Sequence, residues 1–237
     1  MNRKPGAAPK SMQRAPAKTR AMHPLPLRIM HWTNAVVILI MIGSGWRIYN
    51  ASPIFPFTFP EWATLGGDVE WALARHGDPG VATAIAWHFA AMWLLVVSYI
   101  FFMLMGVLSG HFWRDFLPVG PRSVMHDMIA ALRFRLEHRL GEYNAVQKLA
   151  YWGVLALVAV MILSGIAIWK PVQTYPLERL FGGFQGARIV HFIAMAGIVL
   201  FLIVHVALTL LVPRTLLAMV AGRATEPRHV VTPGNAR

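Results

Sequence analysis

Four long apolar segments constrain the fold of this 237-residue chain more than any other feature. They run roughly over residues 29–49, 81–108, 150–169 and 189–212, and each is near or above the roughly 20 residues that a helix needs to cross a bilayer. Apolar residues are continuous in them and do not alternate with polar ones, which favours helices over strands. Only 14% of the residues are charged, against about 25% in soluble proteins. The sequence therefore predicts an all-α integral membrane four-helix bundle.

Lysine and arginine are unevenly distributed around these segments. Seventeen of the 22 lie before the first segment, between the second and third, or after the fourth. Because positively charged flanks stay in the cytoplasm, both termini are predicted to be cytoplasmic. We expect a basic disordered tail over residues 1–24, a four-span domain over 25–215 and a cytoplasmic tail over 216–237. The N-terminal tail is expected to be a solvated flank that orients insertion. It lacks interleaved aromatic residues, so nucleic acid is not an expected partner, and the protein's expected partner is the lipid bilayer.

Two connections between the segments are long enough to contain structure. The loop over residues 51–80 is rich in Phe and Trp, which suits a membrane interface, and a short helix is expected there over 61–75. The loop over residues 111–148 contains an amphipathic stretch, residues 125–140, that is suited to the inner membrane surface.

Histidines inside the apolar segments are the main candidates for function. The chain has no cysteine, which excludes thiolate zinc sites, iron–sulfur ligation and covalent haem attachment. An ionisable side chain within a span is costly and is a candidate functional residue by default. Four of the ten histidines lie in or at the segments: His31, His88, His191 and His205.

The spacing of these histidines predicts two pairs. His191 and His205 are 14 residues apart, which is about 40° short of four helical turns, so both occupy one helix face about 21 Å apart along the axis. Chain direction then matches the depth of His88 with that of His191, and the depth of His31 with that of His205. Facing imidazoles at two depths are typical of two six-coordinate haems, each with two histidine ligands.

The histidines and the polar and small residues near them also have alternative roles. A zinc or copper site would gather its ligands at one depth, which this layout does not do. Intramembrane histidines can, however, simply hydrogen-bond to neighbouring helices. Arg47 could pair with a haem propionate or act as a snorkelling anchor. Small residues in the spans could make room for a flat cofactor or serve ordinary helix packing. They are Gly43, Ser44, Gly45, Gly106, Ser164, Gly165 and Gly197.

Several motifs resemble one family. RIMHW (28–32), GEYNAVQKLAYW (141–152), the span His191–His205 and MVAGR (219–223) are similar to segments of the di-haem cytochrome b subunits of formate dehydrogenases and nickel–iron hydrogenases, which belong with the bacterial cytochrome b561 group. The resemblance covers roughly residues 25–223. It implies that the four histidines ligate two b haems, and that a quinone binds near the cytoplasmic side at Asn144, close to His205. The polar residues Gln147 and Lys148 lie nearby in the sequence. Asn144 could instead only cap a helix, and Val146 stands where the formate dehydrogenase subunit has glycine.

The resemblance implies a membrane cytochrome b in a bacterial inner membrane. It would carry electrons between the quinone pool and an outer-face molybdenum or nickel–iron oxidoreductase, directly or through an iron–sulfur subunit. No catalytic residue is expected, since the sequence contains no nucleophile–base arrangement, P-loop or dinucleotide fingerprint; whether the chain itself reduces quinone stays open. The alternatives are a stand-alone haem oxidoreductase with a soluble acceptor, a transporter, and a haem-free membrane anchor.

Overall fold

Four long helices make up most of the protein. The computed structural model describes residues 19–21, 24–66, 79–110, 112–116, 120–132, 145–211 and 213–225. The long helices are α1 (Leu25–Ala51), α3 (Pro79–Leu108), α5 (Ala145–Trp169) and α7 (Gly183–Leu211), and each is long and apolar enough to cross a membrane. The predicted all-α fold with four spans is thereby confirmed, while the side of the membrane on which the termini lie stays a prediction.

The helices extend beyond the segments that hydropathy marks. α1 begins at Leu25 behind Pro24, with proline in its first turn, and α5 and α7 begin five and six residues before their apolar segments. The reason is that hydropathy marks only the part of a helix that suits hydrocarbon, whereas backbone hydrogen bonding continues through the polar residues that flank it.

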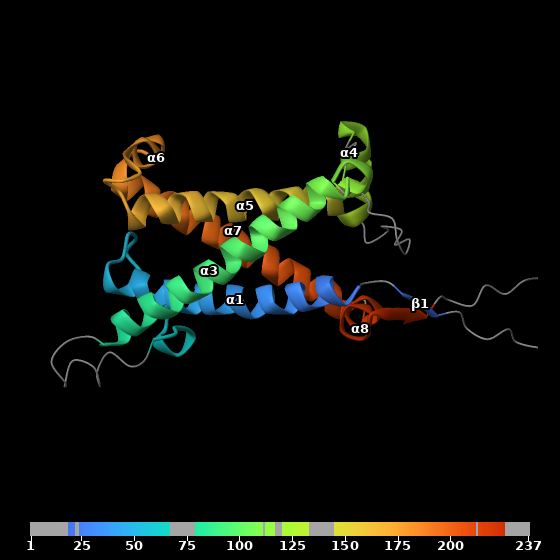
Figure 1. Ribbon diagram of the computed structural model, residues 1–237, viewed down its shortest axis with the longest axis horizontal. Helices are drawn as coiled ribbons and strands as arrows, with labels where there is room; N and C mark the ends of the chain where they lie inside the picture. The colour runs from blue at the N-terminus through green and yellow to red at the C-terminus, as the bar shows by residue number, and fades with distance from the viewer. Residues whose placement is uncertain are drawn as a thin grey trace, which may run out of the picture.

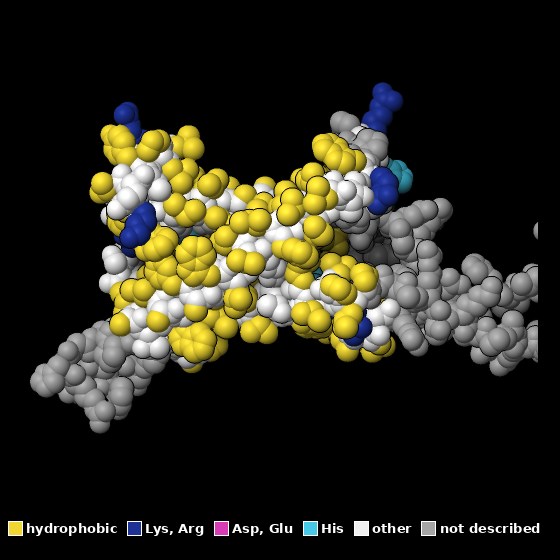
Figure 2. Space-filling model, viewed as in Figure 1, with side chains coloured by type: hydrophobic (Ala, Val, Ile, Leu, Met, Phe, Trp, Pro, Cys, Tyr) yellow, Lys and Arg dark blue, Asp and Glu magenta, His cyan; other side chains and the backbone are white. Residues whose placement is uncertain are grey.

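The four helices pack as two close pairs. α1 lies along α3 and α5 lies along α7, with α3 and α7 running diagonally between the other two (Figure 1). A cluster of Val37, Ala91 and Leu95 joins α1 to α3. A second cluster joins α5 to α7, and Ile38 and Tyr99 pack on it from the other pair; it consists of Val158, Met161, Ala194 and Ile198. Yellow apolar side chains cover the visible face of the bundle, and blue Lys and Arg lie at its ends (Figure 2), as expected for a bundle immersed in lipid.

Short elements occupy the two ends of the bundle. One end carries η1 (Glu61–Ala63) and α6 (Tyr175–Leu180). The other carries the π-helical turn η2 (Phe112–Phe116), α4 (Pro121–Leu132), α8 (Pro213–Ala221), and the strands β1 (Thr19–Ala21) and β2 (Arg223–Thr225). Both ends of the described chain therefore lie at one end of the bundle (Figure 1), as an even number of crossings requires.

The predicted tails contain more structure than their sequence indicates. β1, within residues 1–24, pairs antiparallel with β2, so that Thr19 lies opposite Thr225. α8 crosses the expected boundary at residue 215. Arg28 explains the attachment, because its side chain donates to the carbonyls of Met219, at 3.1 Å, and Val220 in α8. Two motifs that carried the family resemblance are thus in contact across more than 190 residues of sequence.

The two loop predictions are met only in part. Of the helix expected over residues 61–75, the structure has the turn η1, and residues 67–78 lie outside the described chain. α4 covers the first half of the amphipathic stretch at the end of the bundle, and residues 133–144 lie outside the described chain.

Candidate functional site

The structure brings the four intramembrane histidines together in two pairs. His88 of α3 faces His191 of α7, with ring centres 6.4 Å apart; we call this the α3–α7 pair. His31 of α1 faces His205 of α7, with ring centres 6.2 Å apart; we call this the α1–α7 pair. The two pairs are those that helix geometry predicted from the sequence.

Serine side chains contact both rings of the α3–α7 pair. Ser44 Oγ on α1 lies 3.0 Å from His88 Nδ1, and Ser164 Oγ on α5 lies 3.0 Å from His191 Nδ1. Both serines are fully buried. Each histidine of this pair is therefore held from behind by the neighbouring helix of its own close pair.

The structure separates the two interpretations of the small residues. A Cβ on Gly45 would lie 3.4 Å from Cε1 of His88, and one on Gly165 would lie 3.3 Å from Cε1 of His191, so these two glycines make room for the imidazoles. The others serve packing. Gly43 lies against Leu65, Gly197 against Leu157, and Gly106 against the ring of Phe112.

Aromatic rings surround the α1–α7 pair. Phe201, one turn before His205, stacks on its imidazole with ring centres 5.6 Å apart and planes 13° apart. Trp32 meets His31 edge to face at 5.2 Å. The two pairs thus share α7 but differ in their supports: hydroxyl groups behind one, aromatic rings beside the other.

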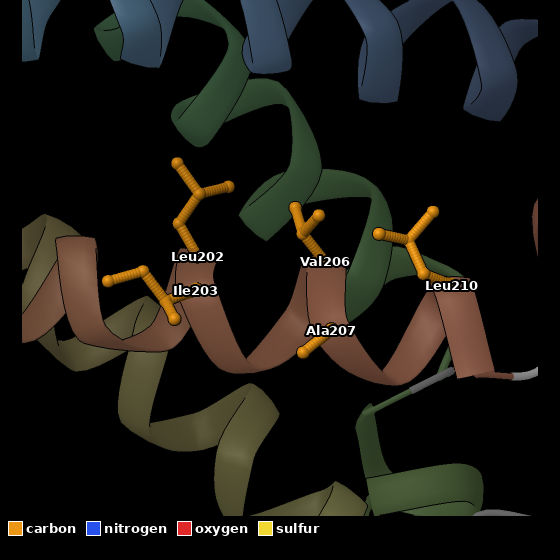
Figure 3. A pocket seen from close by; sticks show the side chains of 5 residues that line it. All are labelled: Leu202, Ile203, Val206, Ala207 and Leu210. Atoms are coloured by element: carbon orange, nitrogen blue, oxygen red, sulfur yellow. The ribbon is translucent and has the colours of Figure 1, made fainter.

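An apolar layer separates the two pairs. Ile198 lies halfway between His191 and His205 on α7, within the buried cluster described above. Beside His205, α7 also borders an open groove of about 400 Å³ lined by Leu202, Ile203, Val206, Ala207 and Leu210. Leu202, Val206 and Leu210 project from the same side of the helix (Figure 3). No histidine among the described residues lines this groove, so it belongs to the apolar surface of α7 and not to either histidine pair.

Arg47 lies inside the bundle, one turn from Ser44. Its side chain is 2% exposed, and its Nη1 is 4.0 Å from Oε1 of Glu61, which is 63% exposed. This burial does not fit a snorkelling anchor, whose charged group reaches water. Beside it, the indole Nε1 of Trp46 is buried and, within the described residues, has no hydrogen-bond acceptor. Two donors, an indole N–H and a guanidinium, thus follow Gly45 directly in the sequence.

An aromatic cap closes the same end of the bundle. Residues 52–60 fold back over α1, where Asn50 exchanges two hydrogen bonds with the backbone of Phe59, at 2.8 and 2.9 Å. Tyr49 donates to the carbonyls of Phe55 and Phe57, and the rings of this cap pack on Phe192, next to His191. The cap therefore packs on the residue next to His191, at the η1 end of the bundle.

Two of the three polar residues expected at a quinone site lie at the start of α5. Asn144 is outside the described residues, while Gln147 and Lys148 are half-buried in the first turn. Asp127 of α4 caps this helix, since its Oδ2 accepts a hydrogen bond from the backbone N–H of Ala145 at 2.9 Å. That bond, together with His126 3.2 Å away, lowers the pKa of Asp127 below its usual value.

The two pairs fit haem. Two imidazole nitrogens on opposite sides of one metal ion, at the usual roughly 2.0–2.1 Å, place the ring centres about 6 Å apart, close to the 6.4 and 6.2 Å observed. Within the described residues, no group of three or more His, Cys, Asp or Glu side chains comes together, so each level offers two opposed donors. Arg47 and the Trp46 N–H are suited to carboxylates such as propionates. The chain could thus hold one haem between His88 and His191, and one between His31 and His205.

The contacts of Ser44 and Ser164 with the histidines did not follow from the helix geometry that paired the rings. An internal repeat in the sequence could have indicated them. Met41-Ile42-Gly43-Ser44-Gly45 parallels Met161-Ile162-Leu163-Ser164-Gly165, and HFAAM (88–92) parallels HFIAM (191–195). The two halves of the chain thus repeat one unit, in which a Ser-Gly pair on one helix supports a histidine on the next.

Comparison with known proteins shows the family of this chain. The model of the prokaryotic cytochrome b561 family matches residues 22–222. A protein of Azospira oryzae named as a putative protein-methionine-sulfoxide reductase subunit, YedZ1, is 45% identical over 203 residues, which cover 85% of this chain and 96% of the relative.

Two more distant relatives also span most of the chain. A B-type cytochrome subunit named for a Ni/Fe-hydrogenase of Bradyrhizobium diazoefficiens is 26% identical over 84% of this chain and 82% of its own length. The cytochrome b556(fdo) subunit of an Escherichia coli formate dehydrogenase is 23% identical over 85% of this chain and 83% of its own. Proteins of this kind are membrane cytochromes that bind haem b and transfer electrons with oxidoreductases. The chain belongs to the prokaryotic cytochrome b561 family.

Proposed function

We propose that this protein carries electrons through two b haems between a redox partner enzyme and the quinone pool of a bacterial inner membrane, with both termini in the cytoplasm. The observation that carries the proposal is the presence of two facing imidazole pairs. Each pair has one ring on α7, and these two α7 histidines are 14 residues apart. In both pairs the ring centres have the separation that one metal ion between the rings requires. Two redox centres at two depths allow electrons to cross the bilayer.

Each part of the chain has a role in this proposal. Bound haem would supply one-electron exchange. His88 and His191 would hold one haem, and His31 and His205 the other. Ile198 and its neighbours keep water out of the layer between the pairs, and the aromatic cap covers the α3–α7 level from the aqueous side. Arg47 would neutralise a propionate in a site where an unpaired carboxylate would be costly.

The quinone site is proposed at the start of α5, beside the α1–α7 level. Reduction of a quinone to a quinol consumes two electrons and two protons, and oxidation of the quinol releases them. Asn144 and Gln147 would hydrogen-bond the quinone oxygens there. The start of α5 lies at the end of the bundle that carries α4 (Figure 1), where protons would exchange with water.

The partner is proposed to be an oxidoreductase at the opposite face, of the molybdopterin or nickel–iron type, reached directly or through an iron–sulfur subunit. The names of the relatives support this class, since they refer to a methionine-sulfoxide reductase, a hydrogenase and formate dehydrogenases. The 45% identity to the first favours a partner of that kind over the other two.

A reduced-minus-oxidised spectrum with haem stoichiometry tests the proposal. Purified protein, expressed with ample haem supply, should contain two b haems per chain, and a short-chain quinol should reduce them. A colourless protein would overturn the proposal. Haems that only a soluble acceptor oxidises, with no exchange with quinol, would support a stand-alone oxidoreductase instead.

Substitution of Asn144 tests the quinone site separately. Asn144→Ala should slow haem reduction by quinol while leaving the haem content at two per chain. An unchanged rate in this variant would show that the quinone binds elsewhere.

A further inference from the structure

We propose that Ser44 and Ser164 are positioning residues of the α3–α7 haem, which fix the tautomer and the ring orientation of His88 and His191. The inference rests on the proposed binding of haem by this pair and adds two residues that do not touch the metal. It is carried by two hydrogen bonds of equal length, 3.0 Å, from different helices to equivalent ring nitrogens.

The direction of these hydrogen bonds follows from the position of each hydroxyl proton. Ser44 Oγ lies 2.6 Å from the carbonyl oxygen of Ile40, and Ser164 Oγ lies 2.6 Å from that of Val160. A carbonyl can only accept, so each hydroxyl donates its single proton into its own helix. The serine oxygen is then left to accept, and the backbone carbonyls of Met41 and Met161 accept from the same two imidazoles. Since every partner on this side of the ring is an acceptor, the imidazole must supply the proton from Nδ1.

This arrangement leaves Nε2 of each histidine without a proton. A neutral imidazole carries one N–H and one lone pair, and the position of the proton is fixed by its hydrogen-bond partner. With Nδ1–H donated to serine, the lone pair lies on Nε2, which is the atom a metal needs. Ser44 and Ser164 therefore prepare both rings as ligands before the metal binds.

The same arrangement of serine, glycine and histidine occurs in both halves of the chain, which argues against a chance contact. On α1 and on α5 the serine is followed by a glycine, Gly45 or Gly165, whose missing side chain admits the imidazole at 3.4 or 3.3 Å. Two unrelated packing accidents would not reproduce the serine bond, the carbonyl bond and the glycine contact together. The common element is a Ser-Gly pair that holds the opposite helix's histidine from behind.

The hydrogen bonds should also lower the midpoint potential of the haem at this level. A hydrogen bond from Nδ1–H to an acceptor makes the imidazole a stronger electron donor, which stabilises the oxidised metal. Removal of either serine hydroxyl should therefore raise the potential of the α3–α7 haem and leave the ring held only by the carbonyl of Met41 or Met161.

The test measures the α3–α7 haem alone, in a His205→Ala background that lacks the other haem. In Ser164→Ala and Ser44→Ala, we expect a higher midpoint potential, altered EPR g values of the oxidised haem and an apparent haem affinity lower by on the order of 10-fold. Ser164→Thr, which keeps a hydroxyl able to bond the carbonyl one turn back, should restore all three readouts.

The control is Ser98→Ala on α3, a buried hydroxyl that, within the described residues, has no hydrogen-bond partner; it should leave potential and g values unchanged. Unchanged potential and g values in Ser44→Ala and Ser164→Ala, with haem still bound, would overturn the inference while leaving the proposed function intact. Absence of haem from the unsubstituted protein would instead overturn the proposed function.

Discussion

The two histidine pairs have the same composition but different supports. At the α3–α7 level, both imidazoles lie 3.0 Å from buried serine hydroxyl groups that repeat in the two halves of the chain. At the α1–α7 level, Phe201 and Trp32 contact the rings. At the α3–α7 level, the two histidines and their two serines occupy equivalent positions of the internal repeat. At the α1–α7 level, the two histidines do not.

This difference between the two levels is visible in the sequence. The repeat aligns His31 of α1 with Tyr151 of α5, and His205 of α7 with Phe102 of α3. His88 and His191 occupy equivalent positions of the repeat, whereas neither histidine of the α1–α7 pair has a histidine at its equivalent position.

Removal of a ligand gives the largest expected difference between the levels. His88→Ala or His191→Ala should abolish the haem of the α3–α7 level only, and His31→Ala or His205→Ala that of the α1–α7 level only, because a single imidazole cannot complete six-coordinate iron. Pyridine haemochrome quantification should fall from two haems per chain to one. The exposed His126→Ala is the control, and full haem content in all four variants would refute the assignment.

Filling the space behind a ring should give the next largest effect. Gly165→Val places methyl groups against His191, at a position where Cβ alone would be 3.3 Å from the ring, and overpacking of this kind costs about 1–3 kcal/mol. We expect partial loss of the α3–α7 haem and an intact α1–α7 haem, measured by stoichiometry and redox titration. Gly153→Val, on the same helix with nothing within 4 Å of a Cβ, should have no effect on either haem.

Loss of the Arg47 charge should affect the α3–α7 haem more than the α1–α7 haem, but less strongly than the two changes above. A buried cation stabilises the reduced form of a nearby haem, since reduction adds negative charge. Arg47→Leu should lower the midpoint potential of the α3–α7 haem, and Arg47→Lys should retain most of the original value. The exposed Arg179→Leu on α6 serves as control. If the α1–α7 haem shifted instead, Arg47 would belong to the other site.

The smallest effect is expected at the far end of the bundle, where Asp127 caps α5. Loss of this cap in Asp127→Ala should cost about 1 kcal/mol of stability, measured by thermal unfolding in detergent. Because the folded-state pKa is lowered, the contribution is complete at neutral pH and is lost as pH falls through that lowered pKa. The variant and the parent should therefore converge in acid, whereas Ser123→Ala on α4 should match the parent at every pH.

Much of the site could be predicted from helix geometry alone. The 14-residue spacing of His191 and His205 and the direction of each span fixed which histidines share a depth, and the structure brings those residues together. The functions of the glycines and serines could not be predicted in the same way. Gly45 and Gly197 look alike in sequence, yet one admits an imidazole and the other a leucine, because the facing residue belongs to another helix.

The sequence by itself determined the number of spans, their direction relative to one another and the pairing of the histidines. These properties depend on the length and periodicity of each apolar segment. Because the rise per residue in a helix is fixed, the spacing of two residues in the sequence gives their separation along the helix axis. Only the tertiary structure decided that Arg47 is buried, that Arg28 holds α8, and that two serines contact His88 and His191. Those contacts depend on which side chains meet across helices, and rotation of a helix about its axis is set by packing and not by hydropathy.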